Sequence, residues 1–296
     1  MKIKNNYDII HTHTPMGAFI TRIVFCLIKK NNTKIVYTAH GFHFYKGASK
    51  KNWLIYYPIE KYFATKTDKL ITITTEDYAL ASEKFKTNVC YMHGVGANNE
   101  KYKVLTAEEK SALRKAQGYS DDDIIFLCTG ELNANKNQST AIDAFEMVHN
   151  KYPNTKLLLA GNGPTDEMLK AKINEKGLEG TVIMLGYRTD LEIFTGLCDI
   201  VVSASFREGM PLNIMEGMIC EKPIVASNNR GHRELIAVGE TGYIVDAHDA
   251  NAFAEKMEEF AKDEAKRIEF GKRGADRIRP WCMDSIVDEL REIYEL

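Results

Sequence analysis

Two hydrophobic patterns alternate along the whole chain. Short runs rich in Ile, Val and Leu predict β-strands, and the segments between them carry apolar residues at helical spacing. The predicted strands are Tyr7–Thr12, Lys34–Ala39, Lys69–Thr74, Asn88–Met92, Ile124–Thr129, Lys156–Ala160, Thr181–Leu185, Asp199–Ala204, Pro223–Ser227 and Gly242–Val245. The predicted helices include Gly17–Lys30, Lys50–Thr65, Glu76–Phe85, Thr106–Gln117, Ala250–Ala261, Glu264–Ile278 and Met283–Leu296. Apolar strands flanked by helices are buried on both faces, which predicts an α/β protein with two parallel sheets.

The charge distribution divides the chain near Asn98–Thr106. The 296 residues carry a net charge of −2, with 44% hydrophobic and 27% charged residues, as expected of a globular protein of two domains. Residues 1–103 hold 16 Lys and Arg against 7 Asp and Glu, whereas the rest of the chain is strongly acidic. The near-neutral total carries no chain-wide signal for nucleic acid, and the asymmetry suggests two parts with different partners.

The cysteines and the apolar runs bear on the compartment. Six cysteines are scattered without a CxxC pair, which predicts buried free thiols in a reducing environment. The longest apolar run, from Ala18 to Ile28, is interrupted by Arg22 and is too short to span a bilayer. We therefore expect a cytoplasmic protein.

The first half of the chain predicts an incomplete domain. Only a few residues precede the first strand, and no glycine-rich turn comes before Tyr7. Four parallel strands form a thin sheet whose first strand would have an open edge. We expect either a preceding segment or a partner chain to cover that edge.

The most informative motif is SFREGMPLNIMEGM, from Ser205 to Met218. It follows a predicted strand, and Gly209 and Pro211 mark a turn that opens a helix. A helix N-terminus at the carboxyl end of a parallel strand offers N–H groups to a phosphate. Glu208 and Glu216 can accept hydrogen bonds from sugar hydroxyls. The alternative is that acidic residues only complement the helix dipole, which accounts for Glu208 but not for Glu216.

The spacing of these glutamates resembles the paired-glutamate motif of retaining glycosyltransferases of family four. The other matching blocks are GELNANKNQ (Gly130–Gln138), LLLAGNGP (Leu157–Pro164), VIMLGYR (Val182–Arg188) and PIVASNNRGHRELI (Pro223–Ile236). In the first half, IIHTHTP (Ile9–Pro15) and YTAHGFHFYKG (Tyr37–Gly47) resemble the capsule and exopolysaccharide branch. The resemblance implies a GT-B fold, with two Rossmann-like, doubly wound domains facing a cleft and the N-terminal one incomplete. It divides the chain into an acceptor-side domain (1–103), a nucleotide-sugar-binding domain (104–280) and a terminal helix (281–296) that packs back on the first.

The resemblance also assigns roles to individual residues. Lys136 would contact the diphosphate of a nucleoside-diphosphate sugar, most often a UDP-sugar, and Glu216 would bind the ribose hydroxyls. Glu208 would contact the donor sugar. The remaining donor contacts are backbone atoms of Gly161, Gly163, Tyr187, Arg188, Gly209, Met210, Pro211 and Leu212. Glu131 stands where the family usually carries an Arg, and Gly161 and Gly163 could equally belong to an ordinary turn.

Four of the eight histidines cluster in the first half, at His11, His13, His40 and His43. A metal site is one explanation, but no HExxH or Cys/His zinc spacing is present, and we expect neither a metal nor another cofactor. The resemblance places His40 opposite the donor sugar and His13 in the same cleft. We expect His43 to be a packed loop residue.

The segment Lys46–Lys69 mixes lysines with aromatic residues. It predicts either an aromatic stripe facing the core or a helix that lies on an anionic membrane. Membrane contact would suit a polyprenyl-linked acceptor, which the resemblance suggests beside a saccharide acceptor. The main hypothesis is therefore hexosyl transfer in surface polysaccharide synthesis. The alternatives are an inactive donor-binding protein, half of a split enzyme completed by a partner chain, and a GT-B sugar-nucleotide epimerase.

Overall fold

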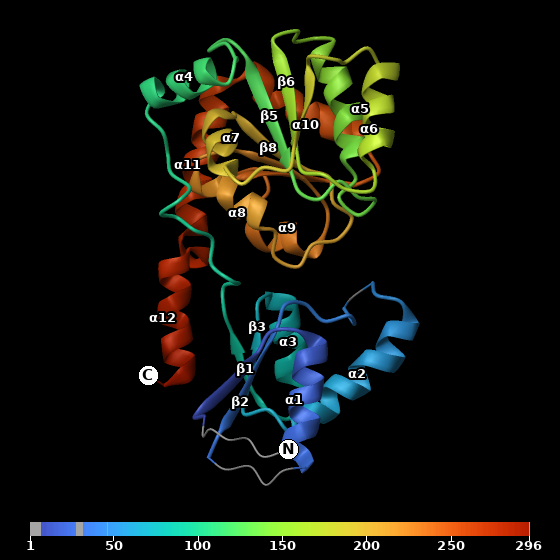
Figure 1. The fold of residues 1–296 in the computed structure, drawn as a ribbon, viewed down its shortest axis with the longest axis vertical. Coiled ribbons are helices and arrows are strands. Elements are labelled where there is room, and N and C mark those ends of the chain that lie inside the picture. Colours follow the sequence, from blue (N-terminus) through green and yellow to red (C-terminus); the bar gives the residue numbers. More distant parts are fainter. Residues whose placement is uncertain (1–6, 28–31, 46, 296) are drawn as a thin grey trace. The chain divides into compact units, whose positions relative to one another are not determined.

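The computed structural model describes residues 7–27, 32–45 and 47–295 and divides them into two units (Figure 1). Unit 1 comprises the described residues up to Gly96 together with those from Asp284 onward. Unit 2 is Ala97–Met283. Each unit contains its own parallel sheet, which confirms the predicted α/β class.

Unit 1 contains a four-stranded parallel sheet in the order β1-β2-β3-β4. The strands are β1 (Ile9–Thr12), β2 (Lys34–Ala39), β3 (Lys69–Thr72) and β4 (Asn88–Tyr91). The helices are α1 (Pro15–Leu27), α2 (Lys50–Ala64), α3 (Thr75–Lys84) and α12 (Met283–Tyr294). Since successive strands are added in one direction and parallel crossovers are right-handed, α1, α2 and α3 cover the same face of this sheet.

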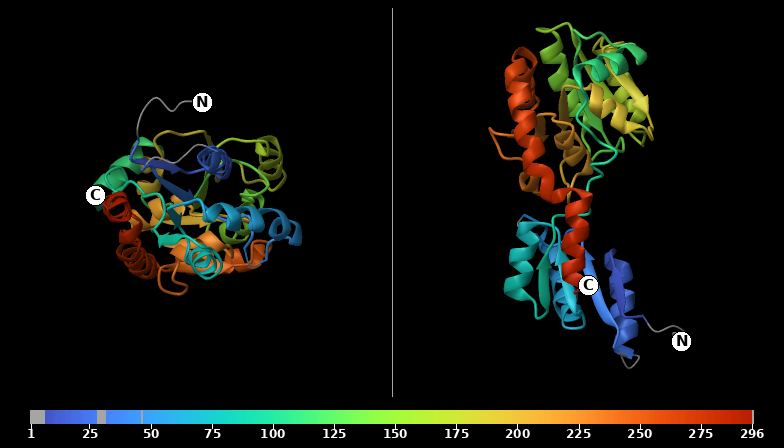
Figure 2. Two further views of the ribbon diagram at one scale, coloured as in Figure 1. Left: turned by 90° about the horizontal axis from the view of Figure 1, so that it is seen from below. Right: turned by 90° about the vertical axis from the view of Figure 1, so that its left-hand side faces the viewer.

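Successive side chains of β2 point alternately to the two faces of this sheet. Tyr37 and Ala39 belong to the apolar core under α1–α3, where they meet Phe44. Thr38 points to the other face, and its hydroxyl oxygen lies within hydrogen-bond distance of Nε2 of His11, at 2.7 Å. Nδ1 of His11 lies 2.5 Å from the hydroxyl of Tyr294, which places α12 over that second face. In the right-hand view of Figure 2, α12 passes in front of the strands.

A buried arginine joins α1 to α2. Arg22 is 1% exposed and binds the Glu60 carboxylate through two nitrogens, at 3.0 and 3.3 Å. Its guanidinium also lies 4.7 Å from the ring centre of Tyr37. Because a buried charge is costly unless it is paired, Arg22 fixes how these two helices pack.

Unit 2 contains a six-stranded parallel sheet in the order β10-β9-β8-β5-β6-β7. The strands are β5 (Ile124–Thr129), β6 (Thr155–Ala160), β7 (Val182–Gly186), β8 (Ile200–Ser203), β9 (Ile224–Ser227) and β10 (Gly242–Val245). The helices are α4 (Ala107–Ala116), α5 (Gln138–His149), α6 (Asp166–Glu175), α7 (Leu191–Leu197), α8 (Leu212–Ile219), α9 (Arg230–Leu235), α10 (Ala250–Lys262) and α11 (Glu264–Ile278), followed by the 3₁₀ turn η1 (Arg279–Trp281).

The strand order of unit 2 reverses between β5 and β8. The chain runs outward through β6 and β7 and then returns to start β8 on the other side of β5. Only two residue pairs join these strands, Phe126 with Ile200 and Leu127 with Val201. Loops that leave the carboxyl ends of two such strands diverge, so a ligand crevice is expected there.

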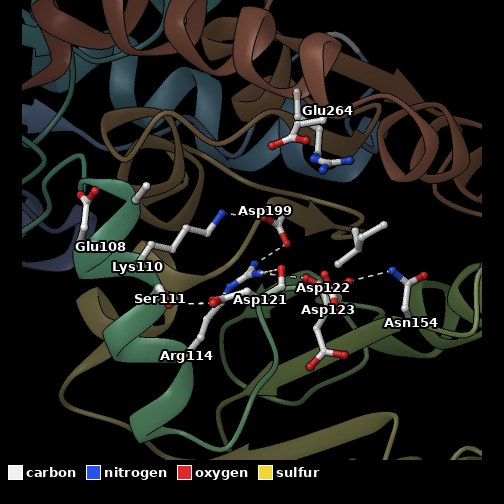
Figure 3. A pocket seen from close by; sticks show the side chains of 13 residues that line it. Glu108, Lys110, Ser111, Arg114, Asp121, Asp122, Asp123, Asn154, Asp199 and Glu264 are labelled. Atoms are coloured by element: carbon white, nitrogen blue, oxygen red, sulfur yellow. Dashed lines mark hydrogen bonds and ion pairs between the residues drawn. The ribbon is translucent and has the colours of Figure 1, made fainter.

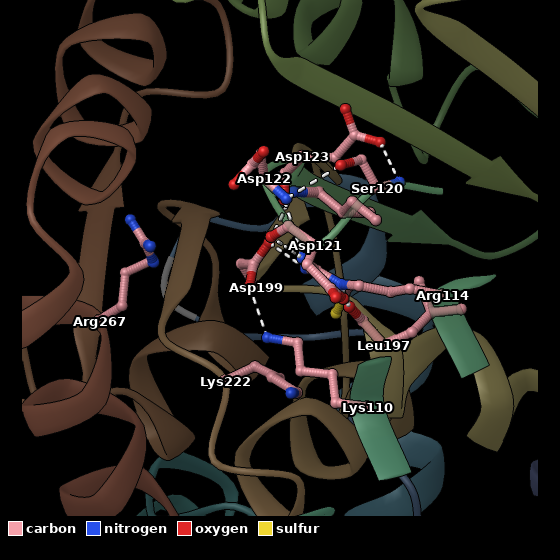
Figure 4. Close-up of polar contacts among 12 residues, drawn as sticks. Lys110, Arg114, Ser120, Asp121, Asp122, Asp123, Leu197, Asp199, Lys222 and Arg267 are labelled. Carbon is pink, nitrogen blue, oxygen red and sulfur yellow. Dashed lines mark hydrogen bonds and ion pairs between the residues drawn. The ribbon is translucent and has the colours of Figure 1, made fainter. Parts of the chain in front are cut away.

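At the opposite, amino edge of this sheet lies a hollow of about 690 Å³ (Figure 3). Three of its charged side chains, Lys110, Arg114 and Asp199, form ion pairs with one another. Arg114 is 4% exposed and donates to the carbonyls of Leu197, Asp121 and Asp123 and to the carboxylate of Asp199 (Figure 4). With its donors used in this way, Arg114 ties α4 to the start of the sheet.

Asp199 is the centre of that network. Its carboxylate accepts hydrogen bonds from Arg114 and Lys110, both at 2.6 Å, and from the backbone N–H of Ile125 at 2.8 Å. Burial raises the pKa of this carboxyl, but Lys110 and Arg114 outweigh burial, and the net pKa lies below its ordinary value. Asp199 therefore holds the amino ends of β5 and β8 together.

Two sequence predictions need correction. The cysteines are all free, but only four are buried, because Cys26 is exposed on α1 and Cys90 is half-buried at the sheet edge. His43 is exposed and stacks on the ring of Tyr56, with 4.7 Å between ring centres, so it is not packed inside a loop. Among the described residues, no helix is long and apolar enough to cross a membrane.

We expect Asp199→Ala to destabilise the protein by about 3–5 kcal/mol, because the buried Arg114 and the partly buried Lys110 lose their shared partner. Asp122→Ala, at an exposed position of the same hollow, should change stability by less than about 0.5 kcal/mol. Urea denaturation of both variants measures the difference. The folded-state pKa of Asp199 is lowered, so its stabilising effect should be present at neutral pH and be lost as the pH falls through that lowered pKa. Equal urea midpoints for the two variants would contradict this account.

Candidate functional site

Most of the sequence-predicted residues of unit 2 lie on loops that leave the carboxyl ends of its strands. Lys136 follows β5, Gly161 and Gly163 follow β6, and Tyr187 follows β7. Glu208 follows β8. The strands are parallel, so these loops gather at one edge of the sheet, opposite the hollow that contains Asp199.

Lys136 and Glu208 meet where the strand order reverses. Nζ of Lys136 lies 2.6 Å from Oε1 of Glu208, and both side chains are partly buried, at 23% and 13% exposed. The Lys136 side chain runs over Gly130, where an added Cβ would lie 3.2 Å from its Cε. Two residues 72 positions apart thus form an ion pair at the switch point of the sheet.

Asparagines of the GELNANKNQ block hold this arrangement together. The side-chain amide of Asn135 donates to the carbonyl of Arg207 at 3.0 Å, and the backbone carbonyl of Asn135 accepts from the N–H of Phe206 at 2.8 Å. Asn137 has a φ of 53° and donates to the carbonyls of Ala204 and Ala247. Sequence reasoning missed these roles, since only the fold brings the β5 and β8 loops together.

The loop from Glu208 to Pro211 leads into the N-terminus of α8. Pro211 occupies the N-cap position, and no side chain of the described residues caps the helix. The next helix, α9, packs closely against this loop, because an added Cβ on Gly231 would lie 2.6 Å from the carbonyl oxygen of Gly209. The start of α8 therefore keeps N–H groups that no side chain satisfies, in a loop that α9 holds in place.

His232 lies buried beside this loop and was not singled out from the sequence. Its Nδ1 lies 2.7 Å from the carbonyl oxygen of Ser227, and Nε2 has no partner among the described residues. Burial lowers the pKa of His232 to about 4, and Glu208 and Lys136 are the charges that act on it. His232 is thus neutral at pH 7.

A cavity of about 290 Å³ opens beside the ion pair, at the ends of β5, β6 and β7. Its lining includes Gly130, Glu131, Gly161, Asn162, Tyr187, Arg188 and Leu191. Tyr187 is 73% exposed, and Arg188 is held by Asp190 through contacts of 2.8 and 2.5 Å. A planar ring could enter this cavity without displacing that pair.

The two glycines of the GNGP segment are required by the packing of the backbone. Gly161 has a φ of +145°, and an added Cβ would lie 2.0 Å from the carbonyl oxygen of Gly130. A Cβ on Gly163 would lie 2.4 Å from the carbonyl oxygen of Leu132. These glycines let the β5 and β6 loops touch, which accounts for them before any ligand is considered.

Glu216 lies on α8 and is hydrogen-bonded to Tyr102, a residue 5% exposed. Burial raises the pKa of Glu216 to about 7, although the Tyr102 hydrogen bond and the nearby Lys101 act to lower it. Tyr102 belongs to the segment in which the sequence predicted only a domain boundary. That boundary segment contributes a buried partner to Glu216.

The clustered histidines lie in unit 1, with His11 inside β1, His13 directly after it and His40 directly after β2. Nδ1 of His13 is 3.3 Å from Nε2 of His40, and the rings of His11 and His13 are 4.1 Å apart. Burial and then the neighbouring His13 lower the pKa of both His11, to about 4, and His40. Among the described residues, no group of three or more His, Cys, Asp or Glu side chains could hold a metal ion.

Comparison with known proteins identifies the family. Residues 109–277 match the family described as glycosyl transferases group 1, and residues 1–74 match glycosyl transferase 4-like. The putative glycosyltransferase EpsD of Bacillus subtilis is 38% identical over 97% of this chain and 76% of its own length. The UDP-Gal:alpha-D-GlcNAc-diphosphoundecaprenol alpha-1,3-galactosyltransferase of Escherichia coli is 24% identical over 98% of this chain and 76% of its length.

The fold is shared with solved glycosyltransferases. HepE of Anabaena, crystallised in complex with UDP, aligns with a TM-score of 0.83 at 22% identity, over 98% of this chain and 79% of its own. This likeness confirms the predicted GT-B fold, with two Rossmann-like units. The chain belongs to the glycosyl transferases group 1 family and is a glycosyltransferase.

Proposed function

We propose that the chain transfers a sugar from a UDP-sugar to a lipid-linked or saccharide acceptor, with retention of the anomeric configuration. The observation that carries the proposal is the contact of Lys136 with Glu208 at the switch point of the unit 2 sheet, beside the N-terminus of α8. A cation next to unsatisfied backbone N–H groups is suited to a diphosphate.

The neighbouring groups fit the rest of a UDP-sugar. The cavity at Tyr187 offers room for the base, and Glu216 offers a carboxylate to the ribose hydroxyls. When the diphosphate binds Lys136, it takes the place of the Glu208 carboxylate, which is then available to a sugar hydroxyl. Crystals of HepE with UDP support a nucleotide of this kind.

The proposed chemistry follows from where charge develops. The bond between the anomeric carbon and the diphosphate oxygen breaks, and its electron pair stays with UDP, where Lys136 and the start of α8 stabilise it. The acceptor hydroxyl attacks the same face of the sugar, and its proton passes to an oxygen of the departing phosphate. The proposed site needs no second carboxylate as a nucleophile, in contrast to retaining glycosidases.

The acceptor side of the proposal draws on relatives and on unit 1. The E. coli relative acts on a sugar linked to diphosphoundecaprenol, which supports a lipid-linked acceptor in polysaccharide synthesis. We assign His13 and His40 to the acceptor and transfer steps because of the family resemblance, and we include peripheral contact with the membrane. The proposal requires no metal or other cofactor.

We expect Lys136→Ala and Glu208→Ala each to lower the rate of transfer by about 100-fold or more, because each removes a contact to developing charge or to the donor. Lys136→Ala should also weaken binding of UDP in isothermal titration. Lys151→Ala is a matched control, since Lys151 forms an equally short pair with Glu258 at 2.6 Å on the surface of the same unit. Unchanged rates in both site variants would remove the proposed site. Formation of a product epimerised at the donor sugar would favour an epimerase instead.

Glu216 should make donor binding depend on pH. As the pH rises through about 7, Glu216 ionises and becomes a stronger acceptor for hydroxyl groups, so affinity for UDP-glucose should rise by about fivefold. UDP-glucose, and not UDP, is the titrant in this experiment, because the diphosphate of UDP-glucose does not titrate near neutrality. Glu216→Gln should abolish this pH dependence. Titration calorimetry across the pH range tests it, and an equally steep profile in the variant would contradict the role of Glu216.

Tyr102→Phe should shift the pH dependence of the affinity for UDP-glucose. The hydrogen bond from Tyr102 lowers the pKa of Glu216, so its loss should shift the rise in affinity to higher pH. Tyr119→Phe, at a partly buried tyrosine that packs against the same core of unit 2, should leave the midpoint in place. A profile that does not move in Tyr102→Phe would show that the tyrosine does not control this carboxylate.

His40→Ala should separate transfer from donor binding. We expect the rate of transfer to fall by about 100-fold while UDP binding stays unchanged, because the proposed nucleotide contacts all belong to unit 2. His43→Ala, at a histidine of the same loop that stacks on Tyr56, is the control for folding. Wild-type transfer rates in His40→Ala would exclude the histidine from the reaction.

A further inference from the structure

The exposed aromatic rings of unit 2 are confined to the edge of the sheet that carries the candidate site. Every Phe, Tyr and Trp of unit 2 lies in the part of the chain that the structure describes, and of these only Tyr187 and Phe206 are exposed, at 73% and 40%. Tyr187 follows β7 and lines the cavity proposed for the base. Phe206 follows β8, on the other side of the point where the strand order reverses. Since single exposed apolar residues are common, the surroundings of Phe206 decide what its ring can do.

Phe206 forms a ring pair with His248, which follows β10. The ring centres are 4.7 Å apart, and the ring planes are tilted by 35°. His248 is exposed as well, so the pair presents aromatic surface to solvent on the loops that leave the carboxyl ends of β8 and β10. We define the aromatic platform as Phe206 and His248.

The aromatic platform is held in place by the two asparagines that flank Lys136. The N–H of Phe206 donates to the backbone carbonyl of Asn135 at 2.8 Å. The side-chain amide of Asn137 donates to the carbonyl of Ala247, immediately before the platform histidine, at 2.9 Å. Both loops of the platform are therefore tied to the segment that carries Lys136, which reduces the cost of ordering them when a ligand binds.

The groups beside the aromatic platform are polar. Arg207 and Asp246 are exposed, and Oδ1 of Asp246 accepts a hydrogen bond from the N–H of His248 at 2.8 Å. The C–H groups on one face of a pyranose ring can pack on an aromatic face, which carries partial negative charge. The sugar hydroxyls can bond to a guanidinium and to a carboxylate. An aromatic ring between such groups is suited to a sugar, whereas a protein partner would need a larger apolar surface.

The proposed donor leaves the aromatic platform unused. Its base is assigned to the cavity at Tyr187, its ribose to Glu216, its diphosphate to Lys136 and its sugar to Glu208. Phe206 precedes Glu208 by two residues, so their backbones lie within about 7 Å of each other. A ring on the platform would thus lie next to the sugar that is transferred, where the acceptor has to be.

We propose that the aromatic platform binds a pyranose ring of the acceptor. The ring stacks on Phe206, and its hydroxyls bond to Arg207 and Asp246. This inference rests on the proposed function and deepens it, because it gives unit 2 a part in recognising the acceptor. It also specifies the chemistry of that acceptor, which carries at least one sugar, whether or not a lipid is attached.

Saturation-transfer NMR of the full chain with chitotriose, maltotriose and cellotriose tests the proposal. We expect at least one trisaccharide to bind, with the strongest transfer to C–H protons of a sugar ring, and to stay bound when UDP is saturating. Phe206→Leu should weaken this binding by about fivefold or more, whereas Phe206→Tyr keeps the ring and should stay within about twofold of wild type. Ile268→Ser, at an apolar residue of α11 that is 49% exposed, is the control for a surface change elsewhere in unit 2.

Three results would overturn the proposal. These are absence of binding by all three trisaccharides, displacement of the trisaccharide by UDP, and equal binding by wild type and Phe206→Leu. UDP titration of each variant checks that unit 2 remains folded. If Phe206→Leu fails that check, His248→Ala removes the other ring and should weaken binding by about threefold, and wild-type binding in it would equally count against the platform. Because trisaccharide binding is measured without a sugar donor, its failure is distinguishable from failure of the proposed transferase, which is assayed by transfer from a UDP-sugar.

Discussion

The pairing of β5 with β8 is the constraint on which unit 2 depends. Only two residue pairs join these strands, yet the strand order reverses between them. A charged contact holds each end of the pair: Asp199 with Arg114 at the amino edge, and Lys136 with Glu208 at the carboxyl edge. At the amino edge, the hydrogen-bond donors of Arg114 are already used within the protein, so that contact is structural. At the carboxyl edge, the side chains of Lys136 and Glu208 remain partly exposed.

That difference between the two edges explains which one can bind a ligand. At the amino edge, the donors of Arg114 are taken by carbonyls and by Asp199, so an incoming anion would have to break several buried bonds. At the carboxyl edge, the proposed diphosphate would have to displace only the Glu208 carboxylate from Lys136. Uncapped N–H groups of α8 add to the attraction, and the adjoining cavity at Tyr187 adds room.

The polar residues of the site are supported by packing that leaves little freedom. Gly161 and Gly231 allow backbones to approach more closely than a Cβ would permit, and Asn137 adopts a left-handed conformation to bond two separate loops. Such positions define the loops before any ligand arrives, so the cost of ordering them on binding is reduced. Unit 1 has a different design, in which Arg22 and Glu60 lock two helices and leave the far side of α2 apolar and exposed.

The sequence by itself determined the α/β class, nearly all element positions and the family, because parallel strands buried on both faces leave continuous apolar runs and because the motif SFREGMPLNIMEGM is local. It also placed the candidate residues on strand ends. Only the tertiary structure decided which of them touch. The pairing of Lys136 with Glu208, of Glu216 with Tyr102, and the burial of His232 join residues far apart in the chain, and their distances follow from strand order, which no local pattern encodes. The orientation of α2 was decided in the same way, since its two apolar faces have similar composition and only packing shows which one reaches the core.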